Sequence, residues 1–396
     1  MTKPVCFLFN HEDVHQIAHS LPVARALAQA HPALDIEIAV STAAQRNAVS
    51  ALLGDDAARL GLRVVELGLS PWMEGITSAL SRIVPARRVA ILSRHLAYLK
   101  GFDALVVPEF TSTLLRSRWQ LTRPALICIP HGSGDRSVGF SDELRLFDLI
   151  LVAGEKTRGR MLDRHPMLAS RIKVCGYPKF DTLDLTRKPK LFNNDRPTVV
   201  YNPHFDPKLS SWYRFGPDVL RFFAEQDRYN LVFAPHVMLF RKLIHGSLEH
   251  RELKWRGSVP DRYRHLDHMM IDPGSTRSVD MTYTLAGDIY LGDVSSQIYE
   301  WIMRPRPAIF LKSHPVDWQH DANYGHWALG PVLDNVAALP ATLDALTADA
   351  TPYLAAQRAA AEATVATGPG TASARCAHAI ATFIGAADQA ALPDSD

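Results

Sequence analysis

The sequence predicts an α/β fold with two doubly wound parallel sheets, one in each half of the chain. Short apolar runs alternate with segments of helical periodicity, and the alternation occurs twice, on either side of a charged, turn-rich stretch at 184–196. The length of 396 residues also suits two domains better than one compact core. Strands of a parallel sheet are buried on both faces, so each reads as a continuous apolar run.

In the first half, helical periodicity at 15–31 and 43–53 alternates with the apolar runs. The predicted strands are 5–9, 36–40, 63–67, 103–107, 125–129, 149–152 and 172–174. We therefore expect a first α/β domain over 1–185, with ligands at the carboxyl ends of its strands.

The second half repeats this pattern after the stretch at 184–196, which we interpret as a linker. Predicted strands are 198–201, 231–234, 269–271, 289–291 and 308–311, and predicted helices are 218–225, 352–366 and 371–384. We expect a second domain over 186–370, followed by a closing helix and a frayed tail over 371–396.

The composition excludes several classes of protein. Lys and Arg number 43 and Asp and Glu 41, so charge gives no argument for nucleic acid as a partner. The four cysteines are far apart, which favours reduced core residues over disulfides or zinc ligands. The first apolar run is too short for a signal peptide, and no run approaches a membrane span. We therefore expect a cytoplasmic protein.

The most informative polar cluster follows the predicted strand 289–291. Gly292, Asp293, Ser295 and Ser296 form a polar turn just before an amphipathic helix that carries Glu300. Free N–H groups and a positive dipole end make a helix N-terminus suitable for phosphate, and Glu300 could accept hydrogen bonds from a ribose diol. Helix capping would explain Asp293 or Ser295 alone, and a solvated position would explain Glu300, but neither explains the whole cluster.

A histidine follows the predicted strand 125–129, in the run of His131, Gly132, Ser133 and, further on, Arg136. Imidazole titrates near neutral pH and can take a proton from an attacking hydroxyl. A turn with a satisfied histidine is an equally good interpretation of this run on its own.

Two further histidines follow strands of the second half. Asn202 and His204 come after 198–201, and His236 comes after 231–234. Histidines at such strand ends could hold a diphosphate, although either could be a simple turn residue. In the first half, His11 and His15 follow the first strand, where we expect an acceptor loop and no metal.

Two basic stretches leave alternatives open. The segment 82–100 interleaves Arg82, Arg87, Arg88, Arg94 and Lys100 with apolar residues, as in helices that lie on an anionic membrane surface. An ordinary surface helix with a buried apolar side has the same pattern. The stretch 241–265 is basic and aromatic, and could guide an anionic substrate or be a long solvated loop.

Taken together, these clusters resemble the CDP-glycerol glycerophosphotransferases of teichoic acid synthesis. His131-Gly-Ser-Gly is similar to the family's His-Gly-Thr-Pro motif, and the run from Gly292 to Ser296 is similar to Thr-Asp-Tyr-Ser-Ser. Ala-Pro-His236 corresponds to Arg-x-His-Pro, with the Arg absent and the proline before the histidine. The resemblance covers about 131–311, and Ser133 and Gly134 stand where the family has Thr-Pro.

This resemblance implies the GT-B fold, with two Rossmann-like domains facing a central cleft. It implies transfer of glycerophosphate from a CDP-activated donor to a hydroxyl of a lipid-linked or glycan acceptor, without a metal or cofactor. His131 would be the general base and His236 the second catalytic residue. Donor-binding residues would be Asn202, His204, Gly292, Asp293, Ser295, Ser296 and Glu300. Acceptor-side residues would be His11, His15, Gly132, Ser133 and Arg136.

Other functions remain open at this point. The same fold serves UDP-sugar glycosyltransferases and UDP-N-acetylglucosamine 2-epimerases, and a non-catalytic nucleotide- or glycan-binding protein would keep the serines without needing His131. A lipid-linked acceptor would place a cytoplasmic enzyme at the inner face of the membrane, with an anionic membrane surface as a partner.

Overall fold

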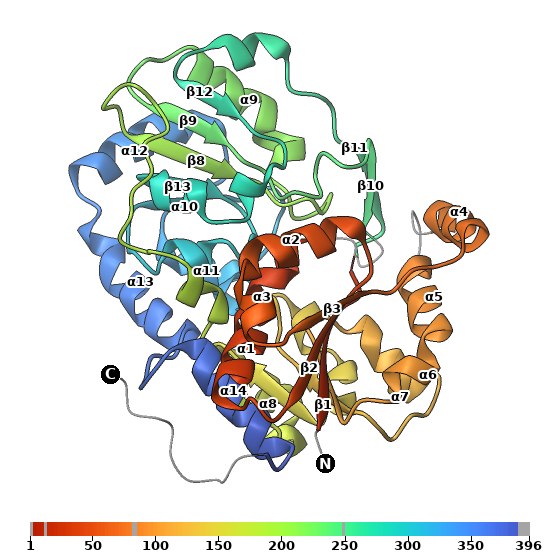
Figure 1. The fold of residues 1–396 in the computed structure, drawn as a ribbon. Coiled ribbons are helices and arrows are strands. Elements are labelled where there is room, and N and C mark those ends of the chain that lie inside the picture. The colour runs from red at the N-terminus through yellow and green to blue at the C-terminus, as the bar shows by residue number, and fades with distance from the viewer. Residues whose placement is uncertain (1–2, 12–13, 81–84, 248–249, 387–396) are drawn as a thin grey trace. The chain divides into compact units, whose positions relative to one another are not determined.

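The computed structural model describes residues 3–11, 14–80, 85–247 and 250–386. Contacts divide the chain into two compact units (Figure 1). Unit 1 comprises Met1–Ser133, Phe140–Leu183 and Glu362–Asp396, and unit 2 comprises Gly134–Gly139 and Asp184–Ala361. Each unit has its own parallel sheet, which confirms the predicted fold class.

Unit 1 is built on a seven-stranded parallel sheet in the order β3-β2-β1-β4-β5-β6-β7. The strands are β1 (Pro4–Phe9), β2 (Asp35–Val40), β3 (Arg63–Glu66), β4 (Ala104–Val107), β5 (Ala125–Cys128), β6 (Leu149–Val152) and β7 (Ile172–Val174). The chain builds outward from β1 in one direction and then from β4 in the other. The β1–β4 boundary is therefore the topological switch point, where ligands of doubly wound sheets bind.

Apolar side chains cover both faces of this sheet. In β1, Val5, Phe7 and Phe9 belong to one hydrophobic cluster, whereas Cys6 and Leu8 belong to another. The first cluster includes residues of α1 (Ile17–Ala30), α2 (Ala43–Leu53) and α14 (Ala372–Phe383); the second includes residues of α5 (Ala86–Arg94), α6 (Leu96–Leu99), α7 (Leu114–Ser117) and α8 (Glu155–Arg164). Alternate side chains of a strand point to opposite faces, so both layers are anchored on β1.

Shorter helices complete this part of the chain. They are α3 (Asp56–Arg59), α4 (Pro71–Leu80) and the 3₁₀ turns η1 (Val14–Gln16), η2 (Thr111–Thr113), η3 (Ser137–Phe140), η4 (Asp142–Leu146), η5 (Pro166–Leu168) and η6 (Pro178–Thr182). Local signals set helix ends where they can be read: the Thr42 side chain accepts the Gln45 N–H at the start of α2, and Gly54 with φ +49° ends it.

Unit 2 contains a six-stranded parallel sheet in the order β12-β9-β8-β13-β14-β15. Its strands are β8 (Thr198–Asn202), β9 (Asn230–Phe233), β12 (Met269–Ile271), β13 (Ile289–Gly292), β14 (Ala308–Leu311) and β15 (Val332–Leu333). The switch point lies between β8 and β13. A separate antiparallel pair, β10 (Ile244–Ser247) and β11 (Glu252–Trp255), forms a hairpin.

Helices again supply apolar residues to two clusters on this sheet. One cluster joins Val199 and Tyr201 to α9 (Trp212–Ala224) and α12 (Leu339–Ala348); the other joins Val200 to α10 (Thr282–Ala286), α11 (Ile298–Trp301) and α13 (Thr351–Thr364). The 3₁₀ turns are η7 (Asp261–His265), η8 (Thr276–Ser278), η9 (Trp318–His320), η10 (Ala322–Leu329) and η11 (Val336–Ala338).

The division of the chain differs from the sequence prediction in two respects. The boundary falls between residues 183 and 184 rather than at 185, and the segment from Glu362 onward groups with unit 1 instead of standing apart. The last segment groups with unit 1 because α14 lies beside α1 (Figure 1) and because Asp181 accepts the N–H and hydroxyl of Ser373 at the start of α14.

The described part of the basic segment, residues 85–100, has the ordinary role of packed helices. Ile91, Leu92 and Leu99 are buried in unit 1, and Arg87 forms an ion pair of 2.8 Å with Glu74. Its apolar side therefore faces the core and is not offered to a membrane; Arg82 lies outside the described residues. None of the helices in the described part of the chain combines the length and apolarity needed to cross a bilayer.

Candidate functional site

Polar residues of unit 2 gather at the carboxyl edge of its sheet, beside the switch point. Asn202 at the end of β8 stands opposite Gly292 at the end of β13. The His236 N–H, after β9, donates to the carbonyl of Pro203 at 2.9 Å, and the His204 and His236 ring centroids are 5.4 Å apart. The structure thus brings together the predicted residues from three separate strands.

Asp293 holds the loop between β8 and α9. Its side chain is buried and accepts the N–H of His204 at 3.0 Å and that of Ser211 at 2.6 Å. Burial raises the pKa of this carboxyl to about 6, although the hydrogen bonds from these N–H groups oppose the shift. The carboxylate positions this loop, and the donor contact expected for Asp293 stays a prediction.

Asn202 and Gly292 also connect the strands to each other. The Asn202 amide donates to the carbonyl of Ala234 at 2.6 Å, so β8 is bonded through this side chain to the end of β9. A Cβ on Gly292 would lie 2.5 Å from the Tyr290 ring, so only glycine fits there. Both residues shape the edge of the sheet, and the donor contact expected for Asn202 stays a prediction.

The predicted helix after the Gly292–Ser296 turn is present and short. It forms a single turn, Ile298–Trp301, because the Arg-Pro-Arg-Pro run soon ends it. A helix of four residues has little macrodipole, so phosphate affinity would depend on individual N–H and hydroxyl groups. Ser296 is exposed at this turn, Glu300 is half-buried on the helix, and the Ser295 Oγ accepts the Gln297 N–H at 3.3 Å.

His204 and His236 both contact the ring of Phe205, with His204 stacked on it and His236 tilted against it. The ring centroids of His204 and His236 lie 4.5 and 4.8 Å from that of Phe205. Burial, together with the charges of His236 and Arg136, lowers the pKa of His204 well below its usual value, so His204 is neutral. Its Nδ1 accepts the Asp206 N–H at 3.0 Å, and the Nδ1 of half-buried His236 accepts the Met238 N–H at 3.3 Å. Both rings therefore carry their proton on Nε2 when neutral.

Unit 1 presents a cluster of histidines beside its own switch point. The Nδ1 of His131 lies 2.8 Å from the carbonyl of Pro108, which follows β4. A carbonyl only accepts, so Nδ1 carries the proton and Nε2 has a lone pair. The His131 ring is solvent-accessible, yet the protein atoms around it lower its pKa; the Pro108 carbonyl opposes this and the charge of Arg88 adds to it. His131 is consequently neutral at pH 7 and has the tautomer of a general base.

The sequence analysis missed His19, which joins this cluster. Ring centroids are 5.8 Å apart for His15 and His131, 6.4 Å for His19 and His131, and 6.3 Å for His11 and His15. His19 is 4% exposed, and its Nδ1 has no hydrogen-bond partner among the described residues. The signal that could have found it is the spacing of four between His15 and His19, which places both on one helix face.

The remaining acceptor-side candidates belong to different units of the chain. Gly132 and Ser133 belong with His131 to unit 1, and the Ser133 carbonyl accepts Lys156 Nζ at 2.6 Å. Arg136 instead belongs to unit 2, where its charge acts on His204. The segment 134–139 groups with unit 2 by its contacts, and the acceptor-side role expected for Arg136 stays a prediction.

A buried polar pair, also missed from the sequence, underlies the turn of unit 2. Asp135 accepts a short hydrogen bond from the Tyr299 hydroxyl and lies 3.1 Å from Nδ1 of His326. The Nε2 of the same ring lies 3.0 Å from the carbonyl of Asp293. Both nitrogens of His326 face acceptors, so the ring bridges Asp135 to the backbone of the turn.

One hollow of unit 2 lies away from these residues. A hollow of about 810 Å³ in unit 2 is lined by parts of 191–196 and 264–271, beside edge strand β12. In the described part of the chain, no group of three or more His, Cys, Asp or Glu residues is placed to hold a metal ion.

Two doubly wound parallel sheets, each with polar residues at the switch point, define the GT-B class of fold. No protein-family model matches this chain, and no curated protein sequence matches it. Solved structures do. The S. aureus MnaA-UDP co-structure matches at 15% identity over 98% of each chain, with a TM-score of 0.61.

Two other solved structures have the same arrangement of elements. A putative UDP-N-acetylglucosamine 2-epimerase from Listeria monocytogenes matches at 13% identity over 100% of both chains, with a TM-score of 0.62. The wall teichoic acid polymerase TagF matches at 13% identity over 97% of this chain and 89% of its own, with a TM-score of 0.59. At such identities the similarity establishes the GT-B fold, and the chemistry has to be argued from the residues.

Proposed function

We propose that this protein is a GT-B transferase that uses a donor activated by a nucleoside diphosphate. The observation that carries the proposal is the state of His131: neutral, with Nδ1 bonded to the Pro108 carbonyl and a lone pair on Nε2. A base of this kind at a strand end suits removal of a proton from an acceptor hydroxyl. His11, His15, Gly132 and Ser133 of unit 1 are the proposed acceptor-side residues.

The proposed reaction is a displacement at phosphorus. The acceptor oxygen transfers its proton to Nε2 of His131 and forms a bond to the β-phosphorus of the donor. The bond from that phosphorus to the bridging oxygen breaks, and the nucleoside monophosphate leaves with the electron pair. The Pro108 carbonyl stabilises the imidazolium that forms, because Nδ1 continues to donate to it.

The donor is proposed to bind at the carboxyl edge of the unit 2 sheet. Ser295 and Ser296 supply hydroxyls, His204 and His236 supply Nε2–H donors for a diphosphate, and Glu300 is the partner for a ribose diol. Asp293, Asn202 and Gly292 belong to the proposed donor site as well, and their internal contacts shape its edge.

CDP-glycerol is the proposed donor, with a lipid-linked or glycan hydroxyl as acceptor. The support is the motif resemblance around His131 and Ser296, together with the fold shared with TagF, a variant of which was solved after a soak with CDPG. Such an acceptor places a cytoplasmic enzyme at the inner membrane face.

A second candidate, a UDP-sugar transferase or 2-epimerase, is favoured by one observation. The Listeria protein described as a putative UDP-N-acetylglucosamine 2-epimerase matches over the whole of both chains. An epimerase needs acid and base groups on either side of the sugar C2, and His19 beside His131 gives the unit 1 cluster a second imidazole. A non-catalytic binding protein would need neither.

A thermal-shift series with CDP-glycerol, CDP, CMP, UDP, UDP-N-acetylglucosamine and GDP tests the donor. A ligand at a hundredfold its Kd adds about 2.7 kcal/mol to the free energy of unfolding and raises Tm. We expect cytidine nucleotides to raise Tm selectively. Stabilisation by UDP compounds alone would replace CDP-glycerol by a UDP-sugar, and no shift with any nucleotide would overturn the donor site.

A further inference from the structure

The β10–β11 hairpin exposes an apolar face to solvent. Ile244 pairs with Trp255 and Gly246 with Leu253, so these four residues share one face of the two-stranded sheet. The exposed fractions are 55% for Ile244, 73% for Leu253 and 67% for Trp255, and the neighbouring Leu243 is 62% exposed. Four large apolar side chains of this short segment are therefore exposed to solvent.

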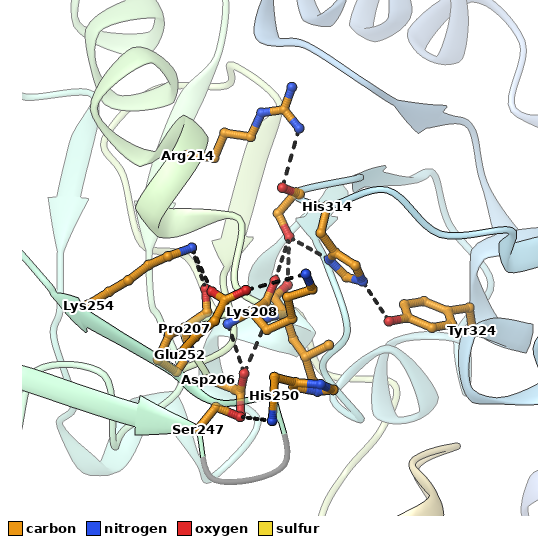
Figure 2. Close-up of polar contacts among 12 residues, drawn as sticks. Asp206, Pro207, Lys208, Arg214, Ser247, His250, Glu252, Lys254, His314 and Tyr324 are labelled. Atoms are coloured by element: carbon orange, nitrogen blue, oxygen red, sulfur yellow. Dashed lines mark hydrogen bonds and ion pairs between the residues drawn. The ribbon is translucent and has the colours of Figure 1, made fainter.

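The opposite face of the hairpin is polar and is held by the protein. Lys254 Nζ donates to the carbonyl of Pro207 at 3.0 Å, and Glu252 forms ion pairs with Lys254 and Lys208 at 3.1 and 3.3 Å. Figure 2 shows these side chains meeting at the 206–208 loop. Buried His245 on the same face lies, through Nε2, 2.9 Å from the carbonyl of Leu239. These contacts set which face of the hairpin points outward.

This arrangement reverses the usual order of a half-covered antiparallel sheet, in which the apolar face packs on the core and the polar face is solvated. Keeping the polar face inward requires the hydrogen bonds and ion pairs just described. Contiguous exposed apolar side chains rimmed by polar residues mark interaction surfaces. The hairpin is therefore built to present Leu243, Ile244, Leu253 and Trp255 to something outside the chain.

The charges around this face are positive. From 241 to 256 the sequence has five Lys or Arg residues and two Glu residues; one of the five, Lys254, lies on the opposite face and is paired with Glu252. Arg241 and Lys242 are exposed where the chain enters β10, and exposed Arg251 precedes β11. A surface complementary to this face has to combine negative charge with apolar groups just beneath it.

We propose that the β10–β11 hairpin docks on an anionic phospholipid bilayer, with Trp255 and its apolar neighbours at the headgroup boundary and the basic residues against lipid phosphates. Tryptophan favours this boundary, and each basic residue near an anionic surface adds attraction. A protein partner fits the face less well, because stable protein interfaces engage roughly 20–30 residues a side. The proposal rests on the membrane location given with the proposed function and assigns a surface to it, and its test with vesicles does not depend on the donor.

Vesicle co-sedimentation of the full chain tests this proposal. We expect binding to vesicles of phosphatidylglycerol and phosphatidylcholine in equal parts, weaker binding at high salt, and little binding to phosphatidylcholine alone. The Leu253→Ser/Trp255→Ser variant should lower the partition coefficient roughly tenfold or more, because two apolar side chains no longer enter the boundary. Met167→Ser is the matched control, since Met167 is 58% exposed on unit 1 and should leave binding unchanged.

Three results would overturn the proposal. The first is absence of binding by the wild-type chain to the anionic vesicles. The second is a loss that follows Trp72→Ser instead, since Trp72 is 68% exposed and lies with Ile76 and Leu80 on one stripe of α4. The third is concentration-dependent self-association in analytical ultracentrifugation that the hairpin variant abolishes, without vesicle binding, which would assign the face to a second copy of the chain.

Discussion

The polar side chains at the carboxyl edges of the two sheets differ in how fully they are hydrogen-bonded within the protein. In unit 1, His131 makes one hydrogen bond of its ring to a backbone carbonyl, and the buried His19 beside it leaves Nδ1 unbonded within the described residues. In unit 2, Asp293 and Asn202 have their side chains engaged with backbone groups of neighbouring segments. At the first edge, His131 keeps a lone pair on Nε2. At the second edge, Asp293 and Asn202 use their side chains to hold neighbouring segments in place.

This difference indicates which polar groups of the protein can still bind a ligand or accept a proton. A buried polar group that is hydrogen-bonded on all sides stabilises the structure and has little capacity left for a ligand. A half-bonded ring such as His131 has that capacity. Variants at the two edges should therefore have separable effects on turnover, on the free energy of unfolding and on donor affinity.

The largest effect is expected for His131→Asn. Asn can still donate to the Pro108 carbonyl but cannot accept a proton, so kcat should fall about 10²–10⁴-fold with little change in Tm. Because the pKa of His131 is lowered from 6.5, the ring becomes protonated only below pH 6.5. The wild-type kcat/KM should therefore fall below that pH. His320→Asn, at a histidine side chain 82% exposed, is the control and should keep full turnover. A fall in Tm without a loss of kcat would make His131 a structural residue and break the contrast.

Asp293→Asn should change the pH dependence of stability. The folded pKa of about 6 lies above the usual 3.8, so between pH 7 and 5 the folded chain takes up a proton that the unfolded chain does not. When the pH falls from 7 to 5, this carboxyl group raises the free energy of unfolding of the wild type by about 1 kcal/mol, and the variant lacks this contribution. Its free energy of unfolding relative to wild type should therefore fall from pH 7 to pH 5 in denaturant titrations. Asp261→Asn, at a side chain 91% exposed, serves as the control; equal pH slopes for wild type and Asp293→Asn would contradict the prediction.

The smallest effect is expected for Ser296→Ala. This exposed hydroxyl should contribute one hydrogen bond to a donor phosphate, so its loss should raise the donor Kd roughly three- to tenfold, with no change in Tm of the ligand-free protein. Titration calorimetry with the nucleotide that stabilises the protein measures it, with exposed Ser170→Ala as control. An unchanged Kd would remove Ser296 from the proposed donor site.

Much of the fold was predictable because burial leaves a mark in the sequence. Strands β6, β7, β12 and β14 and helix α2 have the predicted bounds, since each is an apolar or periodic run limited by turn residues. The hairpin was not predicted, because Ile244, Leu253 and Trp255 follow the rule of alternation but face away from the core.

The sequence by itself determined the two parallel sheets and the positions of polar residues at strand ends, because strands buried on both faces must be apolar and the chain turns polar where they stop. Only the tertiary structure decided which polar residues remain available. Asp293 bonds to the N–H of His204, 89 residues away in sequence, and Asp181 to Ser373, 192 residues away. Hydrogen bonds over such separations depend on how strands and helices pack, and local residue patterns contain no record of them.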